Sequence, residues 1–184
     1  MSIGPGSIFS KGNTLLDKAI FPFLKNGITQ VGWIVDNIDK AVANFYRLTN
    51  IGPWQFFSYG PKILKTMRRN GVDTEFEMAT AVTNAGSLRL EIVQPTFGDM
   101  VYQTYINKFG FGGVQHFGIA VENMEESLDI VKKAGINIAM EGIGYGLEGD
   151  GYFAYLDTEH LFGITLELMC RPKRRREPLK IYPE

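Results

Sequence analysis

Alternation between apolar and polar residues predicts a strand near the start of the chain. From Ile28 to Val35 the residues are mostly β-branched, aromatic or small, and the alternation places Gln30, Gly32 and Ile34 on one face. Residues 36–49 then space apolar side chains at helical intervals, and a Gly-Pro pair soon stops the pattern. A strand followed by a helix therefore begins the predicted fold.

The same two periodicities continue through the rest of the chain. Further strands are predicted at Trp54 to Tyr59, Glu75 to Thr83, Leu88 to Val93, Val114 to Val121, Ile136 to Glu141, Tyr152 to Asp157 and Ile164 to Met169. Further helices are predicted at Asp99 to Phe109 and Glu122 to Ala134. Pro95 is expected to end the strand that begins at Leu88. The connection that follows Tyr59 is predicted to be a loop, and its basic residues are Lys62, Lys65, Arg68 and Arg69.

Two pairs of strands resemble each other across the chain. The strand that contains Gln30 resembles the later strand that contains His116, and these two residues align. In the same way, the strand with Glu91 aligns with the strand with Glu167. Such repetition predicts two copies of one module. The expected fold class is α+β, with two tandem βαβββ modules whose half-barrels form a curved mixed sheet around a metal site.

The repeat divides the chain into five parts. They are an N-terminal arm (1–26), a first βαβββ module (27–95), a linker with a short helix (96–112), a second βαβββ module (113–170) and a basic C-terminal tail (171–184). The arm is expected to cover the mouth of a pocket. Whether the modules close one barrel within a chain or exchange partners across a homodimer stays open.

Composition narrows the class of partner. Of the 184 residues 45% are hydrophobic, and the formal net charge is −1, so nothing global favours nucleic acid or an anionic membrane. The apolar runs are shorter than the roughly 20 residues of a membrane-spanning helix, and the start of the chain lacks the pattern of a secretory signal. A single cysteine, Cys170, fits a reducing compartment, so a cytoplasmic location is expected.

Four polar side chains are candidates for one metal site. If the strands of both modules curl into a shared barrel, Gln30, Glu91, His116 and Glu167 can all point inward. A buried, unpaired carboxylate is costly, and metal binding would offset that cost. One nitrogen and three oxygen donors suit a single divalent ion, and Zn, Ni, Co, Mn and Fe(II) all remain open.

Several motifs resemble the vicinal oxygen chelate superfamily, which includes glyoxalase I, methylmalonyl-CoA epimerase, extradiol dioxygenases and bleomycin-resistance proteins. The motifs are Gln30-Val-Gly-Trp-Ile-Val-Asp-Asn-Ile-Asp-Lys-Ala, Ile51-Gly-Pro-Trp54, His116-Phe-Gly-Ile-Ala-Val121 and Leu166-Glu-Leu168. The resemblance implies that the metal ligands are Gln30, Glu91, His116 and Glu167. This ligand set is similar to that of some glyoxalases I. The long turn from Asp157 to Gly163 looks more like the epimerase branch, although epimerases commonly have His and Gln at the first two ligand positions.

The resemblance implies a metal-dependent isomerase or epimerase that moves a proton next to a carbonyl through a metal-stabilised enolate. The substrate is expected to be a small molecule, either an acyl-CoA thioester or, for a glyoxalase I, a glutathione adduct. Glu91 and Glu167 are the candidate base and acid. Glu77, with Glu75 on the same face, is a reserve candidate for which a solvated position is favoured.

Two further alternatives remain within this superfamily. An extradiol dioxygenase is disfavoured, because Gln30 stands where such an enzyme needs a histidine. A non-catalytic, drug-sequestering protein is disfavoured by the four intact donors.

Structural roles are favoured for the remaining polar and aromatic candidates. His160 is expected in an exposed turn, and Trp54 and Phe56 are expected to pack a core rather than line a pocket. The four basic residues of the predicted loop could hold coenzyme A phosphates, but a solvated loop is favoured. The basic run at 171–176 is interpreted as a solubilising tail, and Cys170 has no evident base partner.

Overall fold

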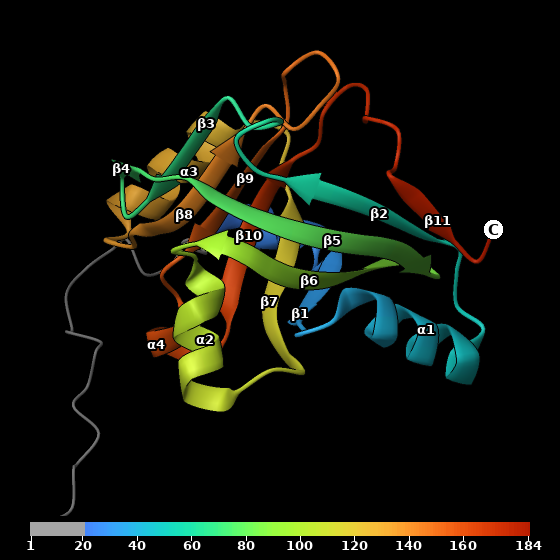
Figure 1. Cartoon of the computed structure of the whole chain (residues 1–184). Helices are drawn as coiled ribbons and strands as arrows, with labels where there is room; N and C mark the ends of the chain where they lie inside the picture. The colour runs from blue at the N-terminus through green and yellow to red at the C-terminus, as the bar shows by residue number, and fades with distance from the viewer. Residues whose placement is uncertain (1–20) are drawn as a thin grey trace, which may run out of the picture.

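The computed structural model describes residues 21–184 (Figure 1). Most of the predicted N-terminal arm, residues 1–20, lies outside this range. The elements are, in chain order, η1 (Pro22–Asn26), β1 (Gln30–Ile34), α1 (Ile38–Thr49), β2 (Trp54–Tyr59), β3 (Thr66–Arg69), β4 (Val72–Asp73), β5 (Phe76–Ala85), β6 (Leu88–Gly98), α2 (Val101–Phe109), β7 (Gly113–Ala120), α3 (Met124–Lys133), β8 (Ile138–Ile143), β9 (Tyr152–Leu156), α4 (Glu159–Phe162), β10 (Thr165–Cys170) and β11 (Lys180–Tyr182).

The described strands form one mixed sheet that curls on itself (Figure 1). Their order is β11-β2-β5-β6-β1-β7-β10-β9-β8-β3-β4. At the centre, β1 pairs antiparallel with β7, and each of them has a parallel partner, β6 or β10. The four central strands therefore repeat the same arrangement about the β1–β7 pair. This confirms the predicted α+β fold with two βαβββ modules.

Matching helix caps support the repeat. The Asn37 side chain accepts a hydrogen bond from the backbone nitrogen of Lys40 at the start of α1, at 2.9 Å. Asn123 caps α3 in the same way through the backbone nitrogen of Glu126, at 3.2 Å. Both asparagines follow an acidic residue after a central strand, so the same local sequence starts each module's long helix.

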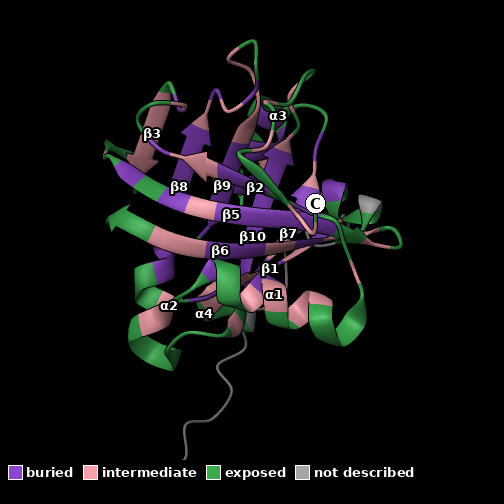
Figure 2. Ribbon diagram, turned by 45° about the vertical axis from the view of Figure 1, so that its right-hand side comes forward, coloured by how far each residue is buried: buried purple, intermediate pink, exposed green. Residues whose placement is uncertain are grey.

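Alternation along the strands separates two kinds of core. On β10, Leu166 and Leu168 belong to the cluster that contains the buried face of α3, and a similar cluster joins the first module to α1. The intervening Glu167 and Met169 point to the other side of the sheet, where Met169 joins a cluster that includes Tyr102 of α2. Figure 2 shows buried residues concentrated on the strands and exposed residues on α1 and α2. The inward face of the curled sheet thus holds both a core and the candidate site.

Two sequence predictions about local structure were wrong. The connection after β2 contains the strands β3 and β4 rather than only a loop, because β3 pairs with β8 of the second module. A local pattern does not reveal such a distant partner. Strand β6 also continues through Pro95 to Gly98. Proline is tolerated there because β1 pairs with β6 only as far as Val93, which leaves Pro95 on a free edge.

The C-terminal segment is an ordered part of the sheet. Its strand β11 pairs antiparallel with β2 at the sheet edge, with Ile181 opposite Gln55. Lys180 forms an ion pair with Asp39 of α1, and its ammonium lies 4.5 Å from the centre of the Phe56 ring. The segment therefore connects the second module back to the first.

Candidate metal centre

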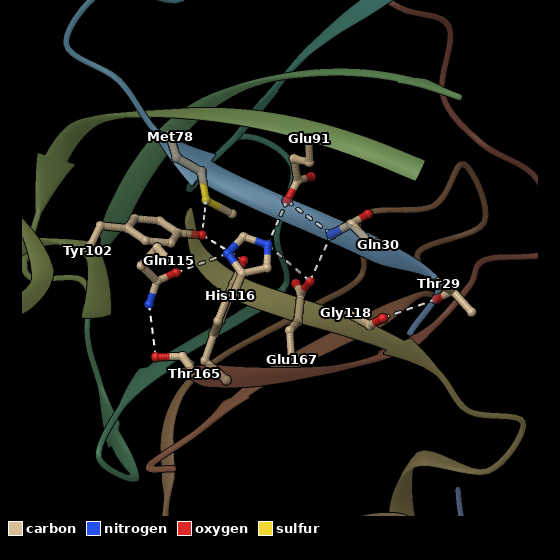
Figure 3. Close-up of polar contacts among 11 residues, drawn as sticks. Thr29, Gln30, Met78, Glu91, Tyr102, Gln115, His116, Gly118, Thr165 and Glu167 are labelled. Carbon is tan, nitrogen blue, oxygen red and sulfur yellow. Dashed lines mark hydrogen bonds and ion pairs between the residues drawn. The ribbon is translucent and has the colours of Figure 1, made fainter. Parts of the chain in front are cut away.

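Four adjacent strands bring the four predicted ligands together (Figure 3). Gln30 lies on β1, Glu91 on β6, His116 on β7 and Glu167 on β10. The Gln30 amide nitrogen donates to the Glu91 Oε2 at 3.1 Å and to the Glu167 Oε2 at 2.9 Å. The His116 Nε2 lies 3.2 Å from the Glu91 Oε2 and 3.6 Å from the Glu167 Oε2. All four side chains therefore point at one small volume.

Two glycines make this convergence sterically feasible. In the antiparallel pairing of β1 with β7, Gly32 lies opposite His116 and Gly118 lies opposite Gln30. A Cβ at Gly32 would be only 2.0 Å from the His116 Nε2, and a Cβ at Gly118 would be 2.7 Å from the Gln30 Cβ. The repeated pattern of a polar residue, any residue and glycine thus leaves room for the other module's polar side chain.

The site is buried, and its ionisable groups shift one another's pKa values. His116 is fully buried and Glu167 is 3% exposed. Burial raises the pKa of the Glu167 carboxyl to about 7, although the charge of His116 opposes the rise, and Glu91 adds to it. Burial lowers the pKa of His116, but its hydrogen bond to Glu91 and the two carboxylate charges outweigh this and raise it overall. Both shifts therefore favour the protonated forms of Glu167 and His116 in the folded, metal-free protein.

Gln115 orients the imidazole, and the sequence analysis did not identify it. Its Oε1 lies 2.9 Å from the His116 Nδ1, and its amide nitrogen donates to the Thr165 hydroxyl at 3.0 Å. Because Gln115 is buried and its nitrogen donates to Thr165, its oxygen accepts a hydrogen bond from the Nδ1–H of His116. The Nε2–H then donates to Glu91, and a metal ion would replace that proton and bind the Nε2 lone pair. A second polar residue directly before the histidine was the only sequence signal for this role.

The four side chains fit a divalent ion. Zinc–nitrogen and zinc–oxygen bonds of about 2.0–2.2 Å allow two ligands to be roughly 3–4 Å apart. Glu91, His116 and Glu167 each have a ligand atom within 4.8 Å of those of the other two. A rotation of the Gln30 carboxamide would present its oxygen in place of its nitrogen. Two carboxylates would also balance the charge of the ion. The donor set therefore suits a metal.

A small cavity of about 40 Å³ opens beside the cluster. Its lining is aromatic and apolar on one part and basic on another. The lining residues are Gln30, Tyr59, Met78, Arg89, Glu91, Tyr145, Phe153, Tyr155, Glu167, Met169, Arg171 and Arg175. Behind this wall, the Tyr102 hydroxyl donates to the Tyr155 hydroxyl at 2.7 Å, and the Tyr155 ring lies edge-on to the His116 ring, 5.1 Å away. Rigid rings therefore support the histidine opposite Gly32.

The reserve and alternative candidates lie elsewhere. Glu77 is exposed and accepts a hydrogen bond from the Ser58 hydroxyl at 3.0 Å, and Glu75 is exposed as well. His160 was expected in a turn but is an exposed residue of the short helix α4, between β9 and β10, and lies 3.5 Å from Asp157. Trp54 is fully buried in the core under α1, as is most of Phe56. Cys170 is half-buried, and its thiol lies 3.6 Å from the Glu122 carbonyl oxygen.

The basic residues of the predicted phosphate loop have different surroundings. Arg68 pairs with Asp73 and with Glu141, at 3.0 and 3.1 Å. The Arg69 guanidinium donates to the Ala139 carbonyl oxygen at 2.6 Å. Both arginines are thus engaged in contacts within the sheet. A phosphate bound in this region would therefore depend on Lys62 and Lys65.

Comparison with known families places this geometry in context. The family model described as the glyoxalase/bleomycin resistance protein/dioxygenase superfamily matches residues 29–155. The chain belongs to this superfamily. No curated protein sequence matches the chain significantly. Within the described residues, no helix of the superfamily fold is long and apolar enough to cross a membrane.

Solved structures share this fold at low sequence identity. A methylmalonyl-CoA epimerase in complex with methylmalonyl-CoA is 17% identical, with a TM-score of 0.54 and coverage of 82% of this chain and 97% of that chain. The epimerase of Mycobacterium tuberculosis is 16% identical, with a TM-score of 0.53 and coverage of 80% and 89%. A hypothetical protein from Bacillus halodurans is 18% identical, with a TM-score of 0.53 and coverage of 82% and 97%.

Proposed function

We propose that this protein is a metal-dependent isomerase or epimerase that removes a proton from a carbon next to a carbonyl group and returns it through an enolate. One observation carries the proposal: Glu91 and Glu167 both lie beside the His116 Nε2, and both line a cavity that is open to solvent. Two carboxylates at one reacting centre can serve as base and acid for the same proton. The divalent ion would supply Lewis-acid stabilisation of the charge that develops on the carbonyl oxygen.

Glu91, Glu167 and Gln115 would have different roles in this reaction. The Glu91 side chain is 12% exposed and lines the cavity, so it is the more accessible base. Glu167 is more deeply buried, only 3% exposed, so it would be the acid that returns the proton from inside the site. Gln115 would keep the His116 Nε2 directed at the ion, while the aromatic wall would exclude water.

A thioester substrate is favoured for two reasons. The solved epimerases that share the fold include one bound to methylmalonyl-CoA and a Streptomyces coelicolor variant bound to 2-nitronate-propionyl-CoA. The cavity is also open at its mouth, so an acyl group could enter while a bulky carrier stays outside. A glyoxalase-type reaction on a glutathione hemithioacetal is the second candidate, and the Gln-Glu-His-Glu donor set favours it.

Exchange of the α-proton tests the proposal. Methylmalonyl-CoA and the hemithioacetal of methylglyoxal and glutathione would each be incubated in heavy water with the metal-loaded protein. We expect metal-dependent deuterium incorporation into one of them and a loss of about 100-fold or more in Glu91→Gln. Gln is also a metal donor, so metal content is measured in parallel to separate loss of the base from loss of the ion.

Glu77→Gln is the matched control, because Glu77 is an exposed glutamate bonded to Ser58 outside the cluster. It should exchange at the wild-type rate. If the metal-loaded protein exchanges no α-proton in either substrate, the isomerase proposal is wrong. Tight binding of either compound by the metal-free protein without turnover would then favour a sequestering protein.

A further inference from the structure

Three arginines line the cavity beside the candidate metal centre. Arg89 lies on β6, two residues before Glu91, and is partly buried. Arg171 directly follows β10, and Arg175 lies further along the C-terminal segment. Parts of the chain that are far apart in sequence thus place three guanidinium groups at one cavity.

The three guanidinium groups are unpaired as far as the described part of the chain shows. Within residues 21–184, none of the three arginines takes part in an ion pair, although Arg68 and Arg69 do. A divalent ion between Glu91 and Glu167 would neutralise the carboxylates of the site. The loaded cavity would then carry three positive charges that repel one another, an arrangement that an anionic ligand stabilises.

Backbone hydrogen bonds hold the segment that carries Arg171 and Arg175 in place. The backbone nitrogen of Lys173 donates to the Asp150 Oδ2 at 2.8 Å, and the Arg174 carbonyl oxygen accepts from the Leu147 nitrogen at 2.9 Å. Beyond Arg175, the Leu179 nitrogen donates to the Phe56 carbonyl oxygen at 2.8 Å, and β11 then pairs with β2. A segment anchored on both sides of Arg175 holds that residue beside the cavity, as a solvated tail would not.

We propose that Arg89, Arg171 and Arg175 form a subsite for a carboxylate or phosphate group of the substrate, next to the metal centre. The ligand class is a carbonyl compound with an anionic group close to its reacting carbon. Planar guanidinium groups suit both kinds of anion because they donate two parallel hydrogen bonds. This inference rests on the proposed function in one respect: the proposed function places the substrate carbonyl at the metal. The anion subsite itself is argued from the three arginines.

Anion binding by the full-length protein tests the subsite without turnover. Malonate, methylphosphonate and the uncharged analogue malonamide would be titrated calorimetrically into the protein, with and without one equivalent of Zn²⁺. We expect at least one anion to bind the loaded protein, malonamide not to bind, and Arg171→Gln/Arg175→Gln to weaken the anion at least tenfold. Both arginines are exposed, so the double variant should keep the wild-type unfolding temperature.

Lys173→Gln/Arg174→Gln is the control, because it removes two positive charges from the same segment without changing the cavity lining. It should weaken the anion less than twofold. If both double variants weaken anion binding equally, the effect comes from overall charge and the subsite is refuted. The subsite is also refuted if the wild-type protein binds neither anion. If the protein exchanges no α-proton, the isomerase proposal is wrong, but anion binding that depends on Arg171 and Arg175 would still support the subsite. Which anion binds more tightly identifies the group.

Discussion

Replacing Gly32 by alanine should remove the metal without unfolding the protein. An ideal Cβ at this position lies 2.0 Å from the His116 Nε2 and Cε1. Carbon atoms in van der Waals contact are about 3.5–4.0 Å apart, so the imidazole would have to move by about 1.5 Å. Its bond to Gln115 and its edge contact with the Tyr155 ring resist that movement.

The expected magnitudes follow from this displacement. Metal–ligand distances tolerate about 0.2 Å, so a shift several times larger should cost at least 100-fold in metal affinity. Crowding a packed interior by one methyl group costs about 1–3 kcal/mol. At about 2–4 °C per kcal/mol for a chain of this size, the metal-free variant should unfold roughly 2–12 °C below the metal-free wild type.

Gly142→Ala is the matched control. Its Cβ would lie 2.2 Å from the Phe153 ring, again within the sheet, but Phe153 offers no ligand atom. Competition with a chromophoric chelator would measure the affinity of both variants, and calorimetry would measure their unfolding. Gly142→Ala should lose stability and keep its metal. Wild-type affinity in Gly32→Ala, or equal loss of affinity in both variants, would refute the steric argument.

Three more predictions concern the same cluster. Gln115→Leu should lower metal affinity about 10–100-fold, measured by the same competition, because the Nδ1 of His116 loses its acceptor. Chelating the metal, at an initial free concentration of about 100 times its Kd, should lower the unfolding temperature by about 5–11 °C. Metal-free protein should lose stability as pH rises from about 4.5 to 7, because the pKa of Glu167 is raised to about 7 in the folded state and its unfolded form ionises first. The pKa of His116 is also raised in the folded protein, so deprotonation of His116 should likewise lower stability as pH rises. Unfolding temperatures recorded across this range that are flat or rising would contradict the shifts.

The internal repeat explains why the centre of the molecule could be predicted from sequence. Strands β1 and β7 each carry a polar residue two positions before a glycine, and their alignment put Gln30 and His116 at equivalent places. Side-chain alternation then decided that Glu91 and Glu167 share the inward face. These are local properties of each strand, so a single sequence contains them.

The remaining parts of the site depend on distant contacts. Arg175 reaches the cavity only because β11 returns to pair with β2, and a short polar strand carries little local pattern. The pairing of β3 with β8 is equally non-local. Gln115 precedes His116 along β7, and strand alternation alone would direct its side chain to the opposite face. Its hydrogen bond to the imidazole belongs to the folded structure.

Metal content is the most direct measurement of the central claim. Wild-type protein and a His116→Ala/Glu167→Ala double variant would be purified without a chelator or a metal-affinity tag and analysed by mass spectrometry. The account predicts about one divalent ion per chain in the wild type and none in the variant. If neither protein holds a metal, even after addition of Zn, Ni, Co and Mn, the four converging side chains are a structural hydrogen-bond network and the proposed metal-dependent chemistry is wrong.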